Sequence, residues 1–299
     1  IIIIGSGPAG LTAAIYASRA RLQTLVLERD TMGAGQIAVT EQVDNYPGLP
    51  HIGGYELGEK FREHATELGT LFCENDVTHL EKKDGSFTAT LEDHTELQAR
   101  SVIYAAGTSY RRLEIAGGRL AGVSYCATCD GAFFKKKTAA VVGGGDVAIE
   151  DAIFLARICE KVYLIHRRNE LRGAKSLQKK LMEMENVEIL WDTVTDSING
   201  ENKVESLSLT NKKTGEKREL PVDGVFIAVG ISPNTEGLED LVAMDGGHYI
   251  LAGEDGKTSR PGIFAAGDVR TKNLRQIVTA VADGANCVTS AERYLNGQQ

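Results

Sequence analysis

The chain uses one local pattern twice, and this repeat limits the folds that it can adopt. An apolar strand, a glycine-rich turn and a helix follow one another at 1–4, 5–10 and 11–17, and again at 139–142, 143–148 and 149–156. Each copy continues into another apolar strand, and such strand–helix–strand units pair their strands in parallel. The repeat predicts an α/β protein with two Rossmann-like, three-layer nucleotide-binding domains.

Length and charge agree with this prediction and narrow the possible partners. The 299 residues are more than one ordinary domain needs. The net charge of -8 argues against binding to nucleic acid or to an anionic membrane. Neither a membrane-spanning apolar run nor a signal-peptide pattern is apparent. We therefore expect a cytoplasmic protein whose partners are small molecules or proteins.

The first glycine turn has the features of a dinucleotide site. Gly5 allows a tight turn, Gly7 lets the backbone approach a pyrophosphate, and Gly10 lets the helix pack on the strand. Glu28 ends the next strand, where a carboxylate can accept hydrogen bonds from both ribose hydroxyls. An ordinary turn followed by a solvated acid is the alternative, and the strand–helix–strand context disfavours it. This site suits an adenosine without a 2'-phosphate.

The second turn carries Gly143, Gly145 and Ala148, but the charge at its ribose position is reversed. Counting 23 residues from the first glycine leads to Glu28 in the first copy and to His166 in the second. Arginines follow at 167, 168 and 172. Guanidinium groups bind phosphate in a bidentate manner, so this site should prefer NADPH to NADH. The alternative is a solvated basic patch, as at 135–137.

Cys126 and Cys129 are separated by two residues and are the strongest local signal of redox chemistry. Such a pair can close a disulfide ring and exchange it with another disulfide. Structural zinc is a poor alternative because the other cysteines stand alone at 73, 159 and 287. A buried structural thiol pair is the second alternative, but Asp130 beside Cys129 suggests a proton donor. We expect no metal site.

The three signals form one electron path. NADPH releases two electrons as a hydride, a dithiol needs two electrons and two protons, and a flavin can connect these donors and acceptors. Two dinucleotide sites and one cysteine pair therefore imply FAD between NADPH and the dithiol.

Six motifs, in order and spacing, resemble bacterial-type low-molecular-weight thioredoxin reductases over essentially the whole chain. They lie at 5–10, 45–48, 126–130, 143–145, 166–172 and 265–269. The resemblance implies FAD, NADPH, a homodimer and thioredoxin as the disulfide partner. It also implies an FAD domain split between 1–111 and 236–299, with an NADPH domain at 112–235.

The resemblance also implies roles for individual residues. Cys129 would lie nearest the flavin, Cys126 would attack the partner disulfide, and Asp130 would be the general acid. The expected cofactor-binding residues are Gly5, Ser6, Gly7, Pro8, Ala9, Gly10, Glu28, Gly35, Gln36, Asn45, Val77, Ala106, Gly107, Gly143, Gly145, Asp146, Val147, Ala148, His166, Arg167, Arg168, Arg172, Gly230, Gly267, Asp268, Arg275, Gln276 and Ile277. Asp146 departs from the expected Asn or Ser and would place a charge near the pyrophosphate.

Other functions fit parts of this pattern. A flavoprotein feeding a peroxide-reducing system would share the chemistry but usually adds an N-terminal thioredoxin-like segment. A ferredoxin:NADP reductase would not need the cysteine pair, and a ferredoxin-driven thioredoxin reductase should lack the three arginines. A non-catalytic redox sensor would bind the same cofactors without sustained NADPH oxidation.

Overall fold

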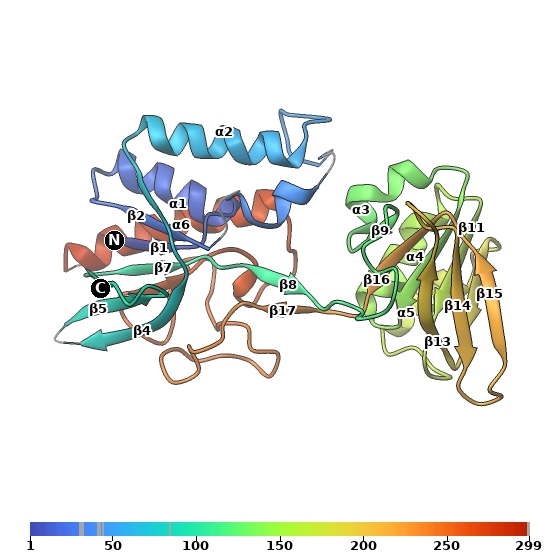
Figure 1. Ribbon diagram of the computed structural model, residues 1–299. Helices are drawn as coiled ribbons and strands as arrows, with labels where there is room; N and C mark the ends of the chain where they lie inside the picture. The colour runs from blue at the N-terminus through green and yellow to red at the C-terminus, as the bar shows by residue number, and fades with distance from the viewer. Residues whose placement is uncertain (30–32, 41–42, 44, 84, 298–299) are drawn as a thin grey trace. The chain divides into compact units, whose positions relative to one another are not determined.

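The computed structural model describes residues 1–29, 33–40, 43, 45–83 and 85–297, and the chain forms two compact units. The first unit comprises Ile1–Ser109 and Ser232–Gln299, and the second comprises Tyr110–Ile231, so the second is inserted into the first (Figure 1). These boundaries lie two and four residues before those expected at 111/112 and 235/236.

The first unit is built on a parallel sheet in the order β18-β7-β1-β2-β3. Its strands are β1 (Ile2–Ile4), β2 (Leu25–Glu28), β3 (Leu71–Glu74), β7 (Val102–Tyr104) and β18 (Ile263–Ala265). Helices α1 (Pro8–Arg19), α2 (Gly54–Glu67) and α6 (Ile277–Leu295) lie on one side of it (Figure 1). An antiparallel sheet of β4 (Val77–Lys83), β5 (Ser86–Leu91) and β6 (Glu96–Ala99) completes the unit.

Alternation along β1 explains the three layers of the first unit. Ile3 packs into the core that α1 and α6 cover, whereas Ile2 and Ile4 pack into a second core together with Phe87 of the antiparallel sheet. Successive strand residues point to opposite faces, so a wholly apolar strand is suited to burial on both sides.

The second unit repeats this plan. Its parallel sheet has the order β12-β11-β10-β16-β9, with bounds β9 (Val123–Ser124), β10 (Thr138–Gly143), β11 (Lys161–Ile165), β12 (Val187–Leu190) and β16 (Gly224–Ala228). On one face lie α3 (Ala127–Asp130), α4 (Asp146–Ala156) and α5 (Lys175–Met182). On the other lies an antiparallel sheet of β13 (Thr193–Asn199), β14 (Ser206–Asn211) and β15 (Lys217–Pro221). The predicted pair of Rossmann-like three-layer units is confirmed.

The segments that join the two units are short strands. β8 (Thr108–Tyr110) and β17 (Ile231–Pro233) form a two-stranded sheet. Short 3-10 helices occupy Gly35–Val39, Gly131–Phe134 and Gly267–Val269. In the part of the chain that the structure describes, no helix is both long enough and apolar enough to span a membrane.

Candidate functional site

The first glycine turn connects β1 to α1 and has no room for side chains. Gly5 has a φ of +101°, and a Cβ added to it would lie 2.5 Å from the carbonyl oxygen of Ala105. A Cβ added to Gly10 would lie 1.8 Å from the carbonyl oxygen of Gly5. Gly7 is the N-cap of α1 and makes no side-chain capping bond, and Pro8 follows it. The turn thus presents backbone N–H groups at a helix N-terminus, which suits a phosphate.

Other predicted residues of the first unit lie beside this turn. A Cβ added to Gly35 would lie 3.2 Å from the Cα of Gly7, and one added to Gly267 would lie 2.9 Å from the Cβ of Ala9. A Cβ added to Gly33 would approach Glu28 Oε2 at 3.1 Å and Ser6 Oγ at 3.6 Å. Residues far apart in the sequence therefore meet at one place, as a single nucleotide site requires.

Glu28 is buried, and only one of its two carboxylate oxygens has a hydrogen-bond partner. Arg62 of α2 donates a hydrogen bond to Oε1 at 2.5 Å, whereas Oε2 is buried and has no hydrogen-bond partner. Arg62 also lies 4.3 Å from the ring centre of Phe72 and 3.8 Å from a carboxylate oxygen of Glu74. A buried acceptor without a donor is costly. Oε2 is therefore able to accept a hydrogen bond from a bound hydroxyl group.

Asp268 presents a second buried acceptor of this kind. Its Oδ1 is buried without a hydrogen-bond partner. Burial raises the pKa of Asp268, while nearby Lys272 and Arg275 lower it. Asn45 donates to the Gln276 side chain at 2.8 Å, and Gln276 caps α6 just before Ile277. The two unpartnered carboxylate oxygens fit a hydroxyl-rich cofactor such as FAD in the first unit.

The remaining first-unit candidates lie at the ends of strands or contact such an end. Gln36 donates to the backbone oxygen of Thr108 and, at 3.0 Å, to its hydroxyl. Asn234 binds the backbone of Ala106 and Gly107, which follow β7. Val77 begins β4 and packs, like Ala106, against the core shared by the two sheets. These contacts give Val77 and Ala106 a packing role whether or not a cofactor touches them.

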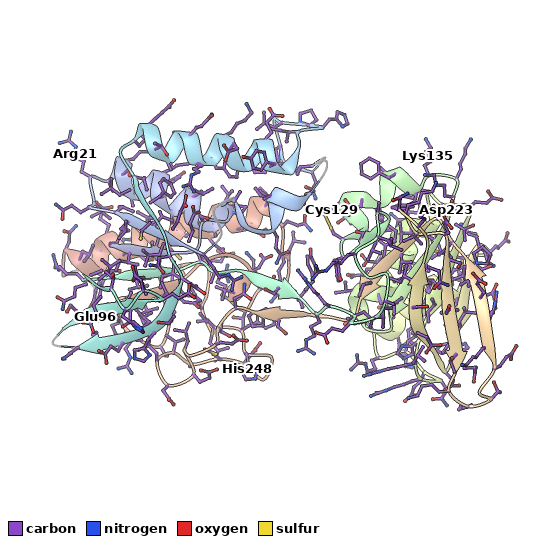
Figure 2. All side chains as sticks on the ribbon, in the orientation of Figure 1. Arg21, Glu96, Cys129, Lys135, Asp223 and His248 are labelled. Atoms are coloured by element: carbon purple, nitrogen blue, oxygen red, sulfur yellow. A yellow bond between two sulfur atoms is a disulfide. The ribbon has the colours of Figure 1, made fainter. Side chains whose placement is uncertain are left out.

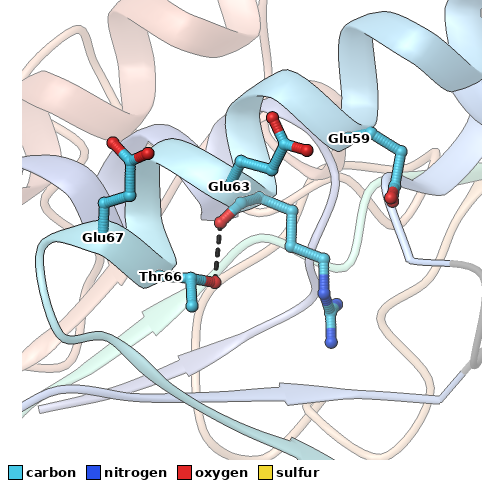
Figure 3. A pocket seen from close by; sticks show the side chains of 5 residues that line it. Glu59, Glu63, Thr66 and Glu67 are labelled. Carbon is cyan, nitrogen blue, oxygen red and sulfur yellow. Dashed lines mark hydrogen bonds between the residues drawn. The ribbon is translucent and has the colours of Figure 1, made fainter.

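A shallow hollow along α2 is a poor cofactor site. It is lined by Glu59, Arg62, Glu63, Thr66 and Glu67 (Figure 3). Thr66 donates a hydrogen bond to the backbone oxygen of Arg62 at 2.8 Å, and three carboxylates surround this pair. Because carboxylates repel phosphate, we assign no nucleotide to the hollow.

The second glycine turn, between β10 and α4, is as tight as the first. A Cβ added to Gly143 would lie 2.6 Å from the Cβ of Ala148. A Cβ added to Gly144 would lie 2.1 Å from Nδ1 of His166, so the ring packs directly against the backbone here. Gly145 is the N-cap of α4, without a side-chain capping bond, and the exposed Val147 is in the first turn. Sequence spacing did not reveal the role of Gly144.

The arginines follow β11 on a loop, 167–173, that we call the arginine loop. Arg167, Arg168 and Arg172 are exposed, and none forms an ion pair with a described acidic residue. The Arg172 N–H donates to Gly144 O at 2.8 Å. Just after the loop, the Ala174 N–H donates to Asp146 Oδ1 at 2.7 Å. This hydrogen bond connects Ala174, which follows the arginine loop, to Asp146, the first residue of α4.

Gly230 lies further along the second unit. Its backbone oxygen accepts a hydrogen bond from the Arg111 N–H at 2.9 Å.

Cys126 and Cys129 form a disulfide with an S–S distance of 2.05 Å and a Cα–Cα distance of 5.3 Å. Figure 2 labels Cys129, which lies in α3 of the second unit. Cys126 is the N-cap of α3, and Cys129 lies within this single helical turn. The Asp130 N–H donates to Cys126 O at 3.1 Å. Cys126 and Cys129 are both half-buried, and disulfide exchange needs a disulfide that an attacking thiolate can reach.

Asp130 is held beside the disulfide by a residue that sequence reasoning missed. Ser124 donates a hydrogen bond to Asp130 Oδ2 at 2.6 Å and accepts one from the Cys126 N–H at 3.1 Å. Burial raises the pKa of Asp130, and the Ser124 hydrogen bond opposes this rise. A carboxyl group with a raised pKa keeps its proton to higher pH and can donate it.

The other three cysteines lack these features. Cys159 and Cys287 are buried, and burial raises the pKa of Cys159 to about 11 and that of Cys287 still further. Cys73 is half-buried. Thiols with raised pKa values are poor nucleophiles. Among the residues described, no group of three or more His, Cys, Asp or Glu side chains could hold a metal ion.

Comparisons with known proteins agree with this arrangement. The family model described as pyridine nucleotide-disulphide oxidoreductase matches residues 1–284. The thioredoxin reductase of Bacillus subtilis strain 168 is 44% identical over 306 residues, covering 100% of this chain and 95% of that protein. The thioredoxin reductase of Treponema pallidum strain Nichols is 41% identical over 305 residues, covering 100% of this chain and 98% of that protein.

Solved structures extend the likeness to three dimensions. The thioredoxin reductase of Streptococcus pyogenes MGAS5005 superposes with a TM-score of 0.90 at 41% identity, over 99% of this chain and 97% of that one. The thioredoxin reductase of Giardia duodenalis gives a TM-score of 0.89 at 37% identity, over 99% and 98% of the two chains. The chain belongs to the pyridine nucleotide-disulphide oxidoreductase family, among its thioredoxin reductases.

Proposed function

We propose that this protein transfers electrons from NADPH, through FAD and the Cys126–Cys129 disulfide, to oxidised thioredoxin. The observation that carries the proposal is the disulfide followed by the hydrogen-bonded Asp130, in a unit that also has a dinucleotide turn and three exposed arginines. The relatives named thioredoxin reductase match the full chain and support the same reaction.

The first unit would hold FAD, which when bound accepts a hydride and passes on two electrons. The N-terminus of α1 would face the pyrophosphate, and Glu28 Oε2 would accept from the adenosine ribose. Asp268 Oδ1, also buried and unpartnered, would accept from a further hydroxyl of the cofactor. Asn45, Arg275 and Gln276 would complete the pocket around the N-terminus of α6.

The second unit would hold NADPH. The turn 143–148 would receive the pyrophosphate at the N-terminus of α4. Arg167, Arg168 and Arg172 would bind the 2'-phosphate, and their lack of acidic partners among the described residues supports this role. A ferredoxin-driven enzyme would have no need for these cations.

The cysteine pair would perform disulfide exchange with thioredoxin. Two electrons break the Cys126–Cys129 bond, and one proton goes to each sulfur that becomes a thiol. The Cys126 thiolate attacks the thioredoxin disulfide, forms a mixed disulfide and releases one thioredoxin thiolate. Cys129 then attacks Cys126, re-forms the intramolecular disulfide and releases the second. Asp130 would supply a proton to a departing thiolate.

We further propose that the protein works as a homodimer in the cytoplasm. The family resemblance supports the dimer, and sedimentation or light scattering would test it. A catalytic disulfide beside three free cysteines is typical of a reducing compartment.

Anaerobic titration of the yellow protein with NADPH, followed by oxidised thioredoxin, tests the whole path. We expect the flavin absorbance to bleach and then to return as thioredoxin is reduced. Bleaching without return would mean a different acceptor, and no bleaching would overturn NADPH as donor. A redox sensor would bind both cofactors yet show no sustained NADPH oxidation.

A further inference from the structure

His166 is a buried imidazole whose two ring nitrogens both face backbone carbonyl oxygens. Its side chain follows β11, and the residue is 4% exposed. Nδ1 lies 2.8 Å from Gly143 O, and Nε2 lies 2.9 Å from Glu170 O. A carbonyl oxygen can only accept a hydrogen bond, and a neutral imidazole has one N–H to donate. Only the doubly protonated imidazolium can satisfy both contacts.

The ring has no alternative orientation that would remove this requirement. A Cβ added to Gly144 would lie 2.1 Å from Nδ1, so the ring is packed against the glycine turn. Trp191 contacts the ring edge-on at a centroid distance of 6.3 Å. The His166 backbone is also fixed, because its N–H donates to Leu190 O and its oxygen accepts from the Thr193 N–H, each at 3.0 Å. Flipping the ring would turn carbon atoms toward both carbonyls and lose both hydrogen bonds.

The two carbonyls belong to different parts of the proposed NADPH site. Gly143 starts the glycine turn, whereas Glu170 lies in the middle of the arginine loop. The ring therefore bridges the turn and the loop, beside the hydrogen bond from Arg172 N–H to Gly144 O. We infer that His166 is an imidazolium that positions the arginine loop against the glycine turn, and that it is not itself a phosphate ligand. This inference rests on the proposed function only for the identity of the nucleotide.

Charged groups surround the ring on its own loop and on the neighbouring elements. Its own loop carries Glu170 and the guanidinium groups of 167, 168 and 172, α4 begins with Asp146, and Asp192 follows β12. Asp192 is paired with Lys213 at 2.9 Å, and Asp146 accepts from the Ala174 N–H. Burial and the three guanidinium groups oppose a positive charge on the ring, whereas its two carbonyl contacts and a bound 2'-phosphate favour it.

Nitrogen-15 NMR of the FAD-loaded, oxidised protein tests the charge of the ring directly and needs no variant. The chain has six histidines, and the other five are exposed. At about pH 7.5 an imidazole in water is mostly neutral. We expect one histidine to show protonated shifts at both ring nitrogens while the others show one protonated and one bare nitrogen. Six neutral histidines would overturn the inference.

The affinity for NADP⁺, which cannot reduce the flavin, tests the positioning role. We expect His166→Gln to bind NADP⁺ about tenfold more weakly than the parent and to bind NAD⁺, which lacks the 2'-phosphate, as the parent does. His79→Gln, on exposed β4 of the other unit, is the matched control and should behave as the parent. Parent-like NADP⁺ affinity, or an equal loss of NAD⁺ affinity, in His166→Gln would overturn the inference. If that variant fails to fold, the NMR result decides.

The outcomes separate this inference from the proposed function. Absence of NADP⁺ binding by the parent protein at every pH would overturn the NADPH site, and the NMR spectrum would still show whether the ring is doubly protonated. NADP⁺ binding that depends on Arg167 and Arg168 but not on His166 would leave the proposed function standing and overturn the inference.

Discussion

The Glu28 carboxylate accepts a hydrogen bond from the Arg62 guanidinium at 2.5 Å through one oxygen and leaves the other buried without a partner. At the matching position of the second unit, both nitrogens of His166 are occupied by backbone oxygens. The first repeat thus leaves one carboxylate oxygen without a partner, whereas both ring nitrogens at the matching position of the second repeat have one. This difference in local contacts is what the proposed assignment of FAD to the first unit and NADPH to the second requires.

Arg62→Met should weaken FAD binding. The substitution leaves the Glu28 carboxylate buried without its cationic partner, which costs about 3 kcal/mol, at the low end for such pairs because Arg62 is partly exposed. The carboxylate should then move, and the proposed ribose acceptor would be lost. Flavin fluorescence during titration of the apoprotein with FAD would show an affinity at least about tenfold lower.

Lys60→Met is the matched control for this variant. Lys60 lies on the same helix, and its ion pair with Glu56 at 3.5 Å is largely exposed. Removal of this ion pair should therefore change FAD affinity little.

Combining Arg62→Met with Glu28→Gln should recover thermal stability without restoring FAD affinity. Equal FAD affinity in Arg62→Met and the parent would contradict the positioning role of Arg62.

Cys129→Ser should bind FAD and NADP⁺ normally yet reduce thioredoxin more slowly by on the order of a thousandfold or more. With Cys129 absent, a Cys126 thiolate that attacks thioredoxin has no neighbour to release it. The variant should therefore accumulate a mixed disulfide, visible as a mass increase that reductant removes. Cys126→Ser should not form this adduct under the same conditions, and Cys73→Ser should retain full turnover. An adduct only with Cys126→Ser would reverse the assigned roles.

Local spacing was enough to predict the fold plan and the two glycine turns, whereas candidates such as Asn45, Asp268 and Gln276 came only from the family resemblance. The two glycine turns, Glu28 and the arginine loop stand at fixed offsets from one another, because each βαβ unit forms from consecutive residues. Arg62 could not be predicted in this way, since it lies 34 residues from Glu28 on a separate helix. The role of Gly144 was equally hidden, because it depends on where the His166 ring packs.

Replacing Arg167 and Arg168 with Gln should narrow the preference for NADPH over NADH. Each guanidinium hydrogen bond to phosphate contributes about 1.5–3 kcal/mol. The KM for NADPH should rise by roughly a hundredfold, and that for NADH should change little. Lys135→Gln with Lys137→Gln, in an exposed basic stretch of the same unit, should leave both constants unchanged. An equal rise in the KM for NADPH and for NADH would instead indicate that the arginine loop has lost its structure.

The pH dependence of thioredoxin reduction should identify Asp130 as the general acid. Burial raises the pKa of its carboxyl group, so the protonated form persists above the usual range of an aspartate and is lost as pH rises. The rate of thioredoxin reduction should therefore fall as pH rises, which gives the pH–rate profile an alkaline limb. Asp130→Asn should be slower by about a hundredfold and lack this limb. Ser124→Ala removes a hydrogen bond that lowers the Asp130 pKa, so the limb should move to higher pH. Stopped-flow measurement of thioredoxin reduction by the prereduced protein isolates this step from NADPH binding. A limb that persists in Asp130→Asn, or one that moves to lower pH in Ser124→Ala, would assign the proton to another group.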